Sequence, residues 1–122
     1  MYFPATGWLA AFLLTVAVEV PVAGWLLRRD EPDRVRLVLL TAFASLATHP
    51  IVWYVWTQVF LVGTPAYLVA AEAFAVLVEA AFYWAAFRGV RPSRALVISL
   101  VANAASFATG TVVTTLWPGV FG

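Results

Sequence analysis

The sequence predicts an all-α polytopic membrane protein, an antiparallel bundle of four transmembrane helices with both termini outside. Three observations predict it: four long apolar segments, a low share of charged residues, and basic residues confined to two connections. Charged residues make up 11% of the chain and hydrophobic residues 64%, whereas about a quarter of the residues in soluble domains are charged. At about 1.5 Å per residue, each segment is long enough to cross about 30 Å of hydrocarbon.

The helices are expected at residues 7–27, 37–62, 67–87 and 95–117. Each segment must be helical because backbone polar groups cannot stay unpaired in lipid. The connections are too short to fold separately and make neighbouring helices antiparallel, so residues 1–122 are expected to form one transmembrane domain. The opening MYFPATGW has no basic residue, so we expect the first segment to be a retained helix and not a cleaved signal peptide.

The connections carry turn and capping signals. Pro32, Pro65 and Pro92 are expected to lie in the connections as helix breakers. Asp30 or Ser93 is expected to cap the helix that follows it, since short polar side chains accept hydrogen bonds from the first free amides of a helix.

The basic residues predict the orientation. All seven are arginines, and all lie in the first and third connections. Because short cytoplasmic loops are enriched in Lys and Arg, both loops are expected in the cytoplasm. Aromatic residues agree: Trp25, Tyr83 and Trp84 fall near that boundary, and Trp53 and Trp117 near the opposite one. The arginine-only, Ala- and Val-rich composition further predicts a bacterial inner membrane.

The third segment contains two acidic residues at membrane depth. Glu72 and Glu79 are seven residues apart, about two helical turns, so they share a face, and Tyr83 continues the same row. An ionisable side chain at this depth costs roughly 2.5–3.5 kcal/mol. Two on one helix therefore need partners from the other segments.

Each segment brings a polar residue to a similar depth, nine positions from the nearest loop arginine: Glu19, Ser45, Glu79 and Asn103. Nine residues correspond to about 13 Å. His49 and Glu72 are expected deeper, at about 20 and 24 Å. Because intramembrane ionisable residues usually mark functional sites, this common level predicts a polar centre inside the bundle, with Leu, Val, Phe and Ala facing lipid.

The predicted ion, proton or substrate site consists of Glu19, His49, Glu72, Glu79 and Asn103. The supporting polar residues are Ser45, Thr48, Ser106 and Tyr83. A cation is a possible cofactor, with Glu19, Glu79 and His49 as its ligands if it is a metal. Pro21 and Pro50 free the carbonyls of Ala17 and Leu46 beside this layer; they either offer cation ligands or only kink their helices.

Several chemistries are excluded or disfavoured. The chain has no cysteine, which removes disulfides, Cys-ligated metal sites and thiol redox chemistry. It contains no Gly-rich phosphate loop, no His-Glu-x-x-His motif and no nucleophile elbow. The arginines occupy loops beside the bilayer, which argues against a nucleic-acid partner.

Three classes of function remain open. The first is a proton- or cation-coupled transporter or conduit, expected to be a homo-oligomer because four helices enclose little volume. The second is an accessory subunit of a larger membrane complex. The third is an intramembrane enzyme acting on a lipid or isoprenoid with paired Glu and His as acid and base, disfavoured because the arginines lie about 13 Å from the carboxylates.

In length, helix count and first-helix glutamate the chain resembles the small multidrug resistance transporters. Glu19, within Ala17-Val18-Glu19-Val20, carries that resemblance. The additional Glu72, Glu79 and His49 depart from the family pattern, so we do not assign the chain to it.

Overall fold

The computed structural model describes residues 5–61 and 64–120. The side chains at 5–8 and 53, and with them the predicted interfacial Trp53, lie outside the described part, as does the predicted end of the second helix at Val62. Five helices are present in the described residues: α1 (Ala5–Leu27), α2 (Arg34–Tyr54), α3 (Trp56–Val59), α4 (Pro65–Ala86) and α5 (Pro92–Leu116).

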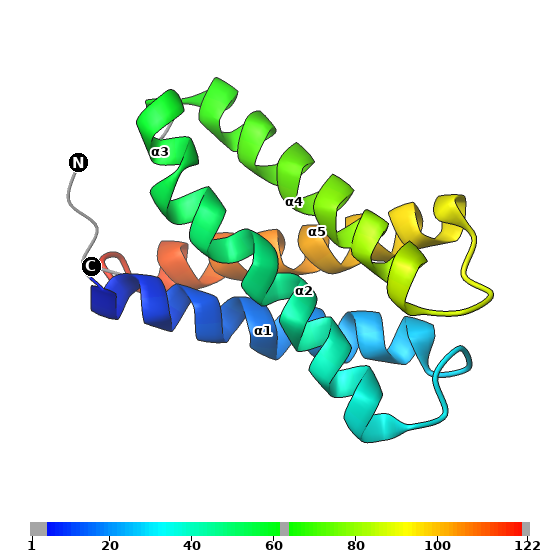
Figure 1. The fold of residues 1–122 in the computed structure, drawn as a ribbon. Coiled ribbons are helices and arrows are strands. Elements are labelled where there is room, and N and C mark those ends of the chain that lie inside the picture. Colours follow the sequence, from blue (N-terminus) through cyan, green and yellow to red (C-terminus); the bar gives the residue numbers. More distant parts are fainter. Residues whose placement is uncertain (1–4, 62–63, 121–122) are drawn as a thin grey trace.

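The all-α prediction is confirmed, since the described residues contain no strand. Four spans are long and apolar enough to cross a membrane: Leu9–Leu27, Arg34–Val59, Pro65–Ala86 and Pro92–Leu116. The second span is interrupted at Val55, which separates α2 from the single turn of α3. The amide of Val55 still donates to the carbonyl of Ile51 at 2.9 Å, so α3 extends the direction of α2 in Figure 1.

The helix starts differ from the predicted ones because proline begins two of them. Pro65 and Pro92 occupy the first turns of α4 and α5 and are not loop breakers; the fixed φ of proline suits that position, where its missing amide hydrogen is not needed. The capping prediction is also wrong. Asp33 caps α2 by accepting from the amides of Val35 and Arg36 at 3.0 and 3.2 Å, and no side chain caps α5.

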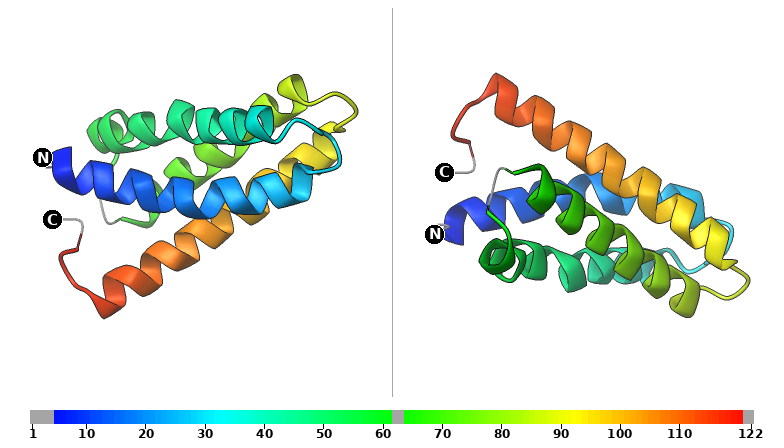
Figure 2. Two further views of the ribbon diagram at one scale, coloured as in Figure 1. Left: turned by 90° about the horizontal axis from the view of Figure 1, so that it is seen from below. Right: turned by 90° about the horizontal axis from the view of Figure 1, so that it is seen from above.

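The four long helices contact one another in a ring. Within the described residues, α1 packs against α2 and α5, and α4 packs against α2 and α5, so α1 and α4 lie on opposite sides of the centre. Consecutive long helices run in opposite directions (Figures 1 and 2). The two arginine-bearing connections therefore lie together at one end, here called the loop end, and the start of α1 and the end of α5 lie at the other, the terminal end.

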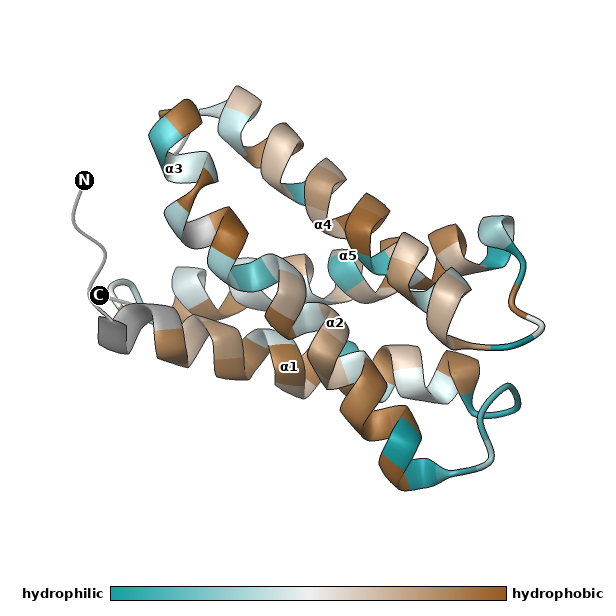
Figure 3. Ribbon diagram, in the orientation of Figure 1, coloured by the Kyte–Doolittle hydropathy of each residue, from teal (hydrophilic) through white to brown (hydrophobic). Residues whose placement is uncertain are grey.

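The helices pack tightly only toward the loop end. Figure 2 shows them converging there and separating toward the terminal end. The apolar core follows the same pattern and consists of Ala23, Leu27, Leu37, Ala44, Tyr83, Phe87, Val90, Ala95, Ile98 and Ala102. In α5 the last buried residue is Asn103. Hydrophilic colour in Figure 3 is concentrated in the loop-end connections, with isolated bands in the middle of the helices.

Two predictions about which residues face lipid are wrong. Alanines were expected outside, but Ala71, Ala75 and Ala102 are among those buried between helices, where small side chains allow close approach. Tyr83 was expected at the membrane interface, but it is 1% exposed and belongs to the apolar core. Leu77 and Val97, like many Leu and Val residues, are exposed as expected.

The capping geometry gives a direct test at the loop end. We expect Asp33→Ala to lower the free energy of unfolding by about 1 kcal/mol, because two amides of α2 lose their acceptor. Ser93→Ala is the matched control and should change it by less than about 0.5 kcal/mol, as usual for exposed sites. Equilibrium unfolding in mixed micelles measures both, and equal effects would contradict the assignment of Asp33 as the cap.

Candidate functional site

The carboxyl group of Glu19 binds three helices together at mid-bundle. Its side chain is 4% exposed. Ser45 of α2 donates to Oε2 at 2.7 Å, and Ser106 of α5 donates to Oε1 at 2.8 Å. Each oxygen of this carboxyl group therefore has a hydroxyl partner from a different neighbouring helix.

Glu79 makes the corresponding connection between α4 and α5. Its side chain is 1% exposed, and the Asn103 amide donates a short hydrogen bond to its Oε2. The same amide also donates to the Ser99 carbonyl at 2.9 Å, and the Ser99 hydroxyl donates to the Val76 carbonyl at 2.7 Å. Asn103 is thus fixed within its own helix and presents its donor to the carboxyl group.

The two carboxyl groups meet across the centre of the ring. Glu19 and Glu79 are within hydrogen-bonding reach of each other, although their helices lie on opposite sides of the bundle. Oε1 of Glu79 is buried and receives no hydrogen bond from a protein donor. An ionised carboxylate only accepts, so a hydrogen bond between the two groups would need a proton on one of them. We call Glu19, Glu79 and their donors Ser45, Asn103 and Ser106 the carboxyl cluster.

A cavity of about 150 Å³, here the central cavity, lies beside this cluster. Its lining includes Glu19 and Asn103 from the cluster, together with Thr48, His49 and Glu72. His49 and Glu72 are half-buried. The cavity therefore brings together all the predicted site residues except Glu79, which does not line it.

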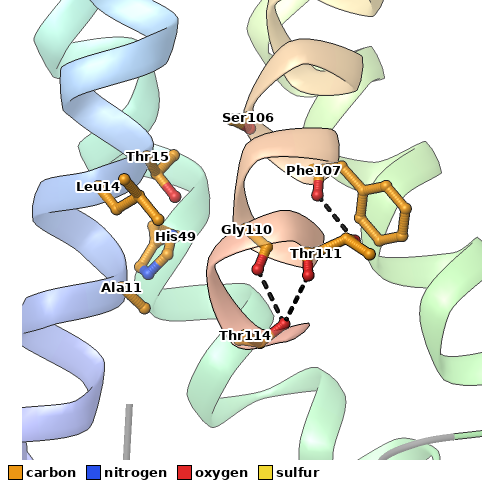
Figure 4. A pocket seen from close by; sticks show the side chains of 9 residues that line it. All are labelled: Ala11, Leu14, Thr15, His49, Ser106, Phe107, Gly110, Thr111 and Thr114. Atoms are coloured by element: carbon orange, nitrogen blue, oxygen red, sulfur yellow. Dashed lines mark hydrogen bonds between the residues drawn. The ribbon is translucent and has the colours of Figure 1, made fainter. Parts of the chain in front are cut away.

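A second cavity of about 300 Å³, the terminal cavity, continues toward the terminal end between α1 and α5. It shares Thr15, His49, Ser106 and Phe107 with the central cavity. Figure 4 shows Thr15 and His49 on one side of this space and Phe107, Gly110 and Thr114 on the other. The two cavities therefore adjoin each other and lie in succession between the terminal end and the carboxyl cluster.

The opposite direction is closed. Leu27, Leu37, Tyr83 and Phe87, all 3% exposed or less, fill the space between the cluster and the loop end. Arg94 of α5 closes the loop end further by binding Asp30 at 2.6 Å and the Leu26 carbonyl at 2.8 Å. The cluster is therefore closed off from the loop end.

A third opening faces sideways. A largely apolar groove of about 280 Å³ lies between α4 and α5 and shares Glu72, Asn103 and Phe107 with the central cavity. Phe107 lines all three spaces. Phe107 was not among the predicted site residues, because nothing in its local sequence distinguishes it from the other phenylalanines. Thr15, which lines the central and terminal cavities, was not predicted either.

A metal centre has less support than a proton site. No group of three or more His, Asp or Glu side chains among the described residues could hold a metal ion. Both oxygens of Glu19 already accept hydrogen bonds from hydroxyl groups.

Comparisons with family models, curated proteins and solved structures found no match to this chain.

The carboxyl pair gives a spectroscopic prediction. We expect the infrared spectrum of the protein at neutral pH to contain a protonated carboxyl band whose frequency shifts in both Glu19→Gln and Glu79→Gln, because each substitution changes the hydrogen bonding of the carboxyl group that remains. Glu72→Gln is the control, since Glu72 lies outside the pair, and it should leave that band unshifted. A band that is unshifted in both pair variants would contradict the contact between the two carboxyl groups.

Proposed function

We propose that this chain is a small membrane carrier in which the Glu19–Glu79 pair exchanges its proton for a cation. The supporting observation is the pair itself: two buried carboxyl groups within reach of each other, beside cavities that lead toward the terminal end while the loop end is closed. A structural hydrogen bond within the membrane needs no such cavities.

The chemistry of exchange follows from electrostatics. Two carboxylates about 4 Å apart repel by roughly 4 kcal/mol at an effective dielectric constant of 20. This is more than the roughly 1 kcal/mol that one neutral hydrogen bond contributes, so loss of the shared proton cannot leave the cluster unchanged. Either a cation replaces the proton or α1 and α4 separate, and both outcomes couple proton loss to another event.

Glu72 and His49 line the path between the pair and the terminal cavity. In the proposed carrier they pass protons or a cation toward the pair, since a carboxyl group and an imidazole both bind and release protons readily. The closed loop end favours alternating access over an open conduit, because a continuous channel would have to pass between Leu27 and Phe87.

The proposal includes an orientation. With both arginine connections at one end of the bundle, the positive-inside rule puts that end in the cytoplasm and both termini outside, in a bacterial inner membrane. The carboxyl cluster is then open to the exterior in this structure. The carrier is further proposed to be a homo-oligomer of this chain, because four helices enclose little volume.

The two other classes of function have less support. The hydroxyls of Thr111, Thr114 and Thr115 donate to carbonyls of their own helix, so the exposed half of α5 does not require a partner subunit for its hydrogen bonds. An enzyme acting on phosphorylated lipids needs cationic groups at its site, and all the arginines lie in the connections or in the first turns of α2 and α5.

Transport is tested with purified protein in liposomes that hold a pH-sensitive dye and an imposed proton gradient. Na⁺, K⁺, Mg²⁺ and methylammonium are supplied in turn, and at least one should dissipate the gradient faster than in empty liposomes. Glu19→Gln and Glu79→Gln should reduce that flux to the empty-liposome background, because neither variant has a carboxyl pair. The absence of flux with every cation, or unchanged flux in both variants, would count against the carrier.

Glu31→Gln is the matched control for that assay. It makes the same change of side chain in a loop-end ion pair with Arg36, an exposed interaction at 3.0 Å that contributes at most about 1 kcal/mol. Its flux should equal that of the wild type. A loss equal to that in the pair variants would indicate a general sensitivity to charge and not a specific site.

Orientation is tested by labelling, which the absence of native cysteine makes simple. A membrane-impermeant thiol reagent added to intact cells should label Val120→Cys near the terminal end, because that end is proposed to be outside. Ser93→Cys at the loop end should react only after the cells are opened. The reverse pattern would overturn the proposed orientation.

A further inference from the structure

A groove of about 300 Å³ lies between α1 and α2 toward the loop end, and it shares no lining residue with the cavities beside the carboxyl cluster. Its walls are mainly apolar, and two arginines line the part of the groove nearest the loop end of the bundle. The lining residues are Val20, Pro21, Gly24, Trp25, Arg28, Arg34, Leu37 and Val38. Gly24 lies where there is open space on the groove side, since a Cβ atom there would meet only Leu37, at 4.0 Å.

Neither arginine at the rim forms an ion pair within the described residues. The ion pairs found there join Arg36 to Glu31 and Arg94 to Asp30. Asp33, the remaining acid of this connection, accepts from the first amides of α2. The guanidinium groups of Arg28 and Arg34 are therefore available at the end of the groove.

Arg28 is also held in position. Its guanidinium group lies 4.1 Å from the centre of the Trp25 ring and donates to the Trp25 carbonyl at 2.6 Å. The ring itself is 63% exposed. An arginine fixed in this way loses little freedom when it binds a phosphate, and its planar donors match phosphate oxygens well.

From these observations we propose that the groove between α1 and α2 binds one anionic phospholipid, with an acyl chain against Gly24 and Val38 and the phosphate between Arg28 and Arg34. The groove runs from Arg28 to Val20, eight residues or about 12 Å along α1, which accommodates much of an acyl chain. Net charge selects the lipid, because the cation of a zwitterionic headgroup is repelled by both arginines. Basic pockets between helices at the cytoplasmic face suit such headgroups.

The test uses the full chain in detergent with phosphatidylglycerol or phosphatidylcholine, and native mass spectrometry to count bound lipid. One phosphatidylglycerol should remain bound where phosphatidylcholine does not. The double variant R28Q/R34Q should bind it roughly tenfold or more weakly, given the contribution of each arginine near a membrane surface. Equal retention of the two lipids by the wild type would overturn the proposal.

Two further variants separate a built site from general attraction. R88Q/R91Q removes the same charge from the same end of the molecule without touching the groove, and it should keep its lipid. Gly24→Leu fills the groove with all arginines intact and should lose it; circular dichroism verifies that the helices are retained. If R88Q/R91Q loses lipid as R28Q/R34Q does, binding is only nonspecific attraction to the loop end and the proposal fails.

Inorganic phosphate and glycerol phosphate are the last probes. Because the apolar groove is part of the site, neither should displace phosphatidylglycerol from the wild type at equal concentration. Displacement by either would mean that the arginines alone bind phosphate, which would overturn the assignment of the groove to a lipid.

Discussion

The arrangement of the helices depends on one constraint, that an acidic group surrounded by hydrocarbon must find hydrogen-bond donors. Each such group costs roughly 2.5–3.5 kcal/mol when it enters the membrane alone. The donors to Glu19 come from α2 and α5, and the donor to Glu79 comes from α5. The same contacts that offset this cost therefore join the helices, so the positions of the acids and the packing of the bundle cannot vary independently.

Much of the helical fold could be predicted from the sequence. The four spans can be recognised as long apolar segments of the sequence. Each must be helical, because a helix pairs all the backbone N–H and C=O groups of a single segment in lipid. The level shared by Glu19, Ser45, Glu79 and Asn103 follows from counting residues along helices of known rise. Ser106 was predicted as a supporting polar residue, and it donates to Glu19.

The rest depends on tertiary contacts that no local pattern contains. The carboxyl pair comes from α1 and α4, which lie on opposite sides of the ring. Counting residues from the loop arginines gives the depth of each acid in the membrane, but it does not show which helices face each other. Burial of Tyr83 in place of its predicted interfacial position has the same origin, since depth says nothing about which way a side chain faces. Asp30 was predicted as a cap, but it pairs with Arg94 of α5, which is distant in sequence. The cap of α2 is Asp33, three residues later, because the helix begins directly after it.

The position of α5 in the ring has a consequence for biosynthesis. This helix leaves the ribosome after the other three, yet it carries the hydroxyl and amide that Glu19 and Glu79 bind. Both acids must therefore enter the bilayer before all their partners exist, and the insertion machinery or protonation must carry them through that interval. The polar centre is therefore completed only at the end of assembly, and a chain that stops short of α5 lacks the donors Ser106 and Asn103 for its two buried acids.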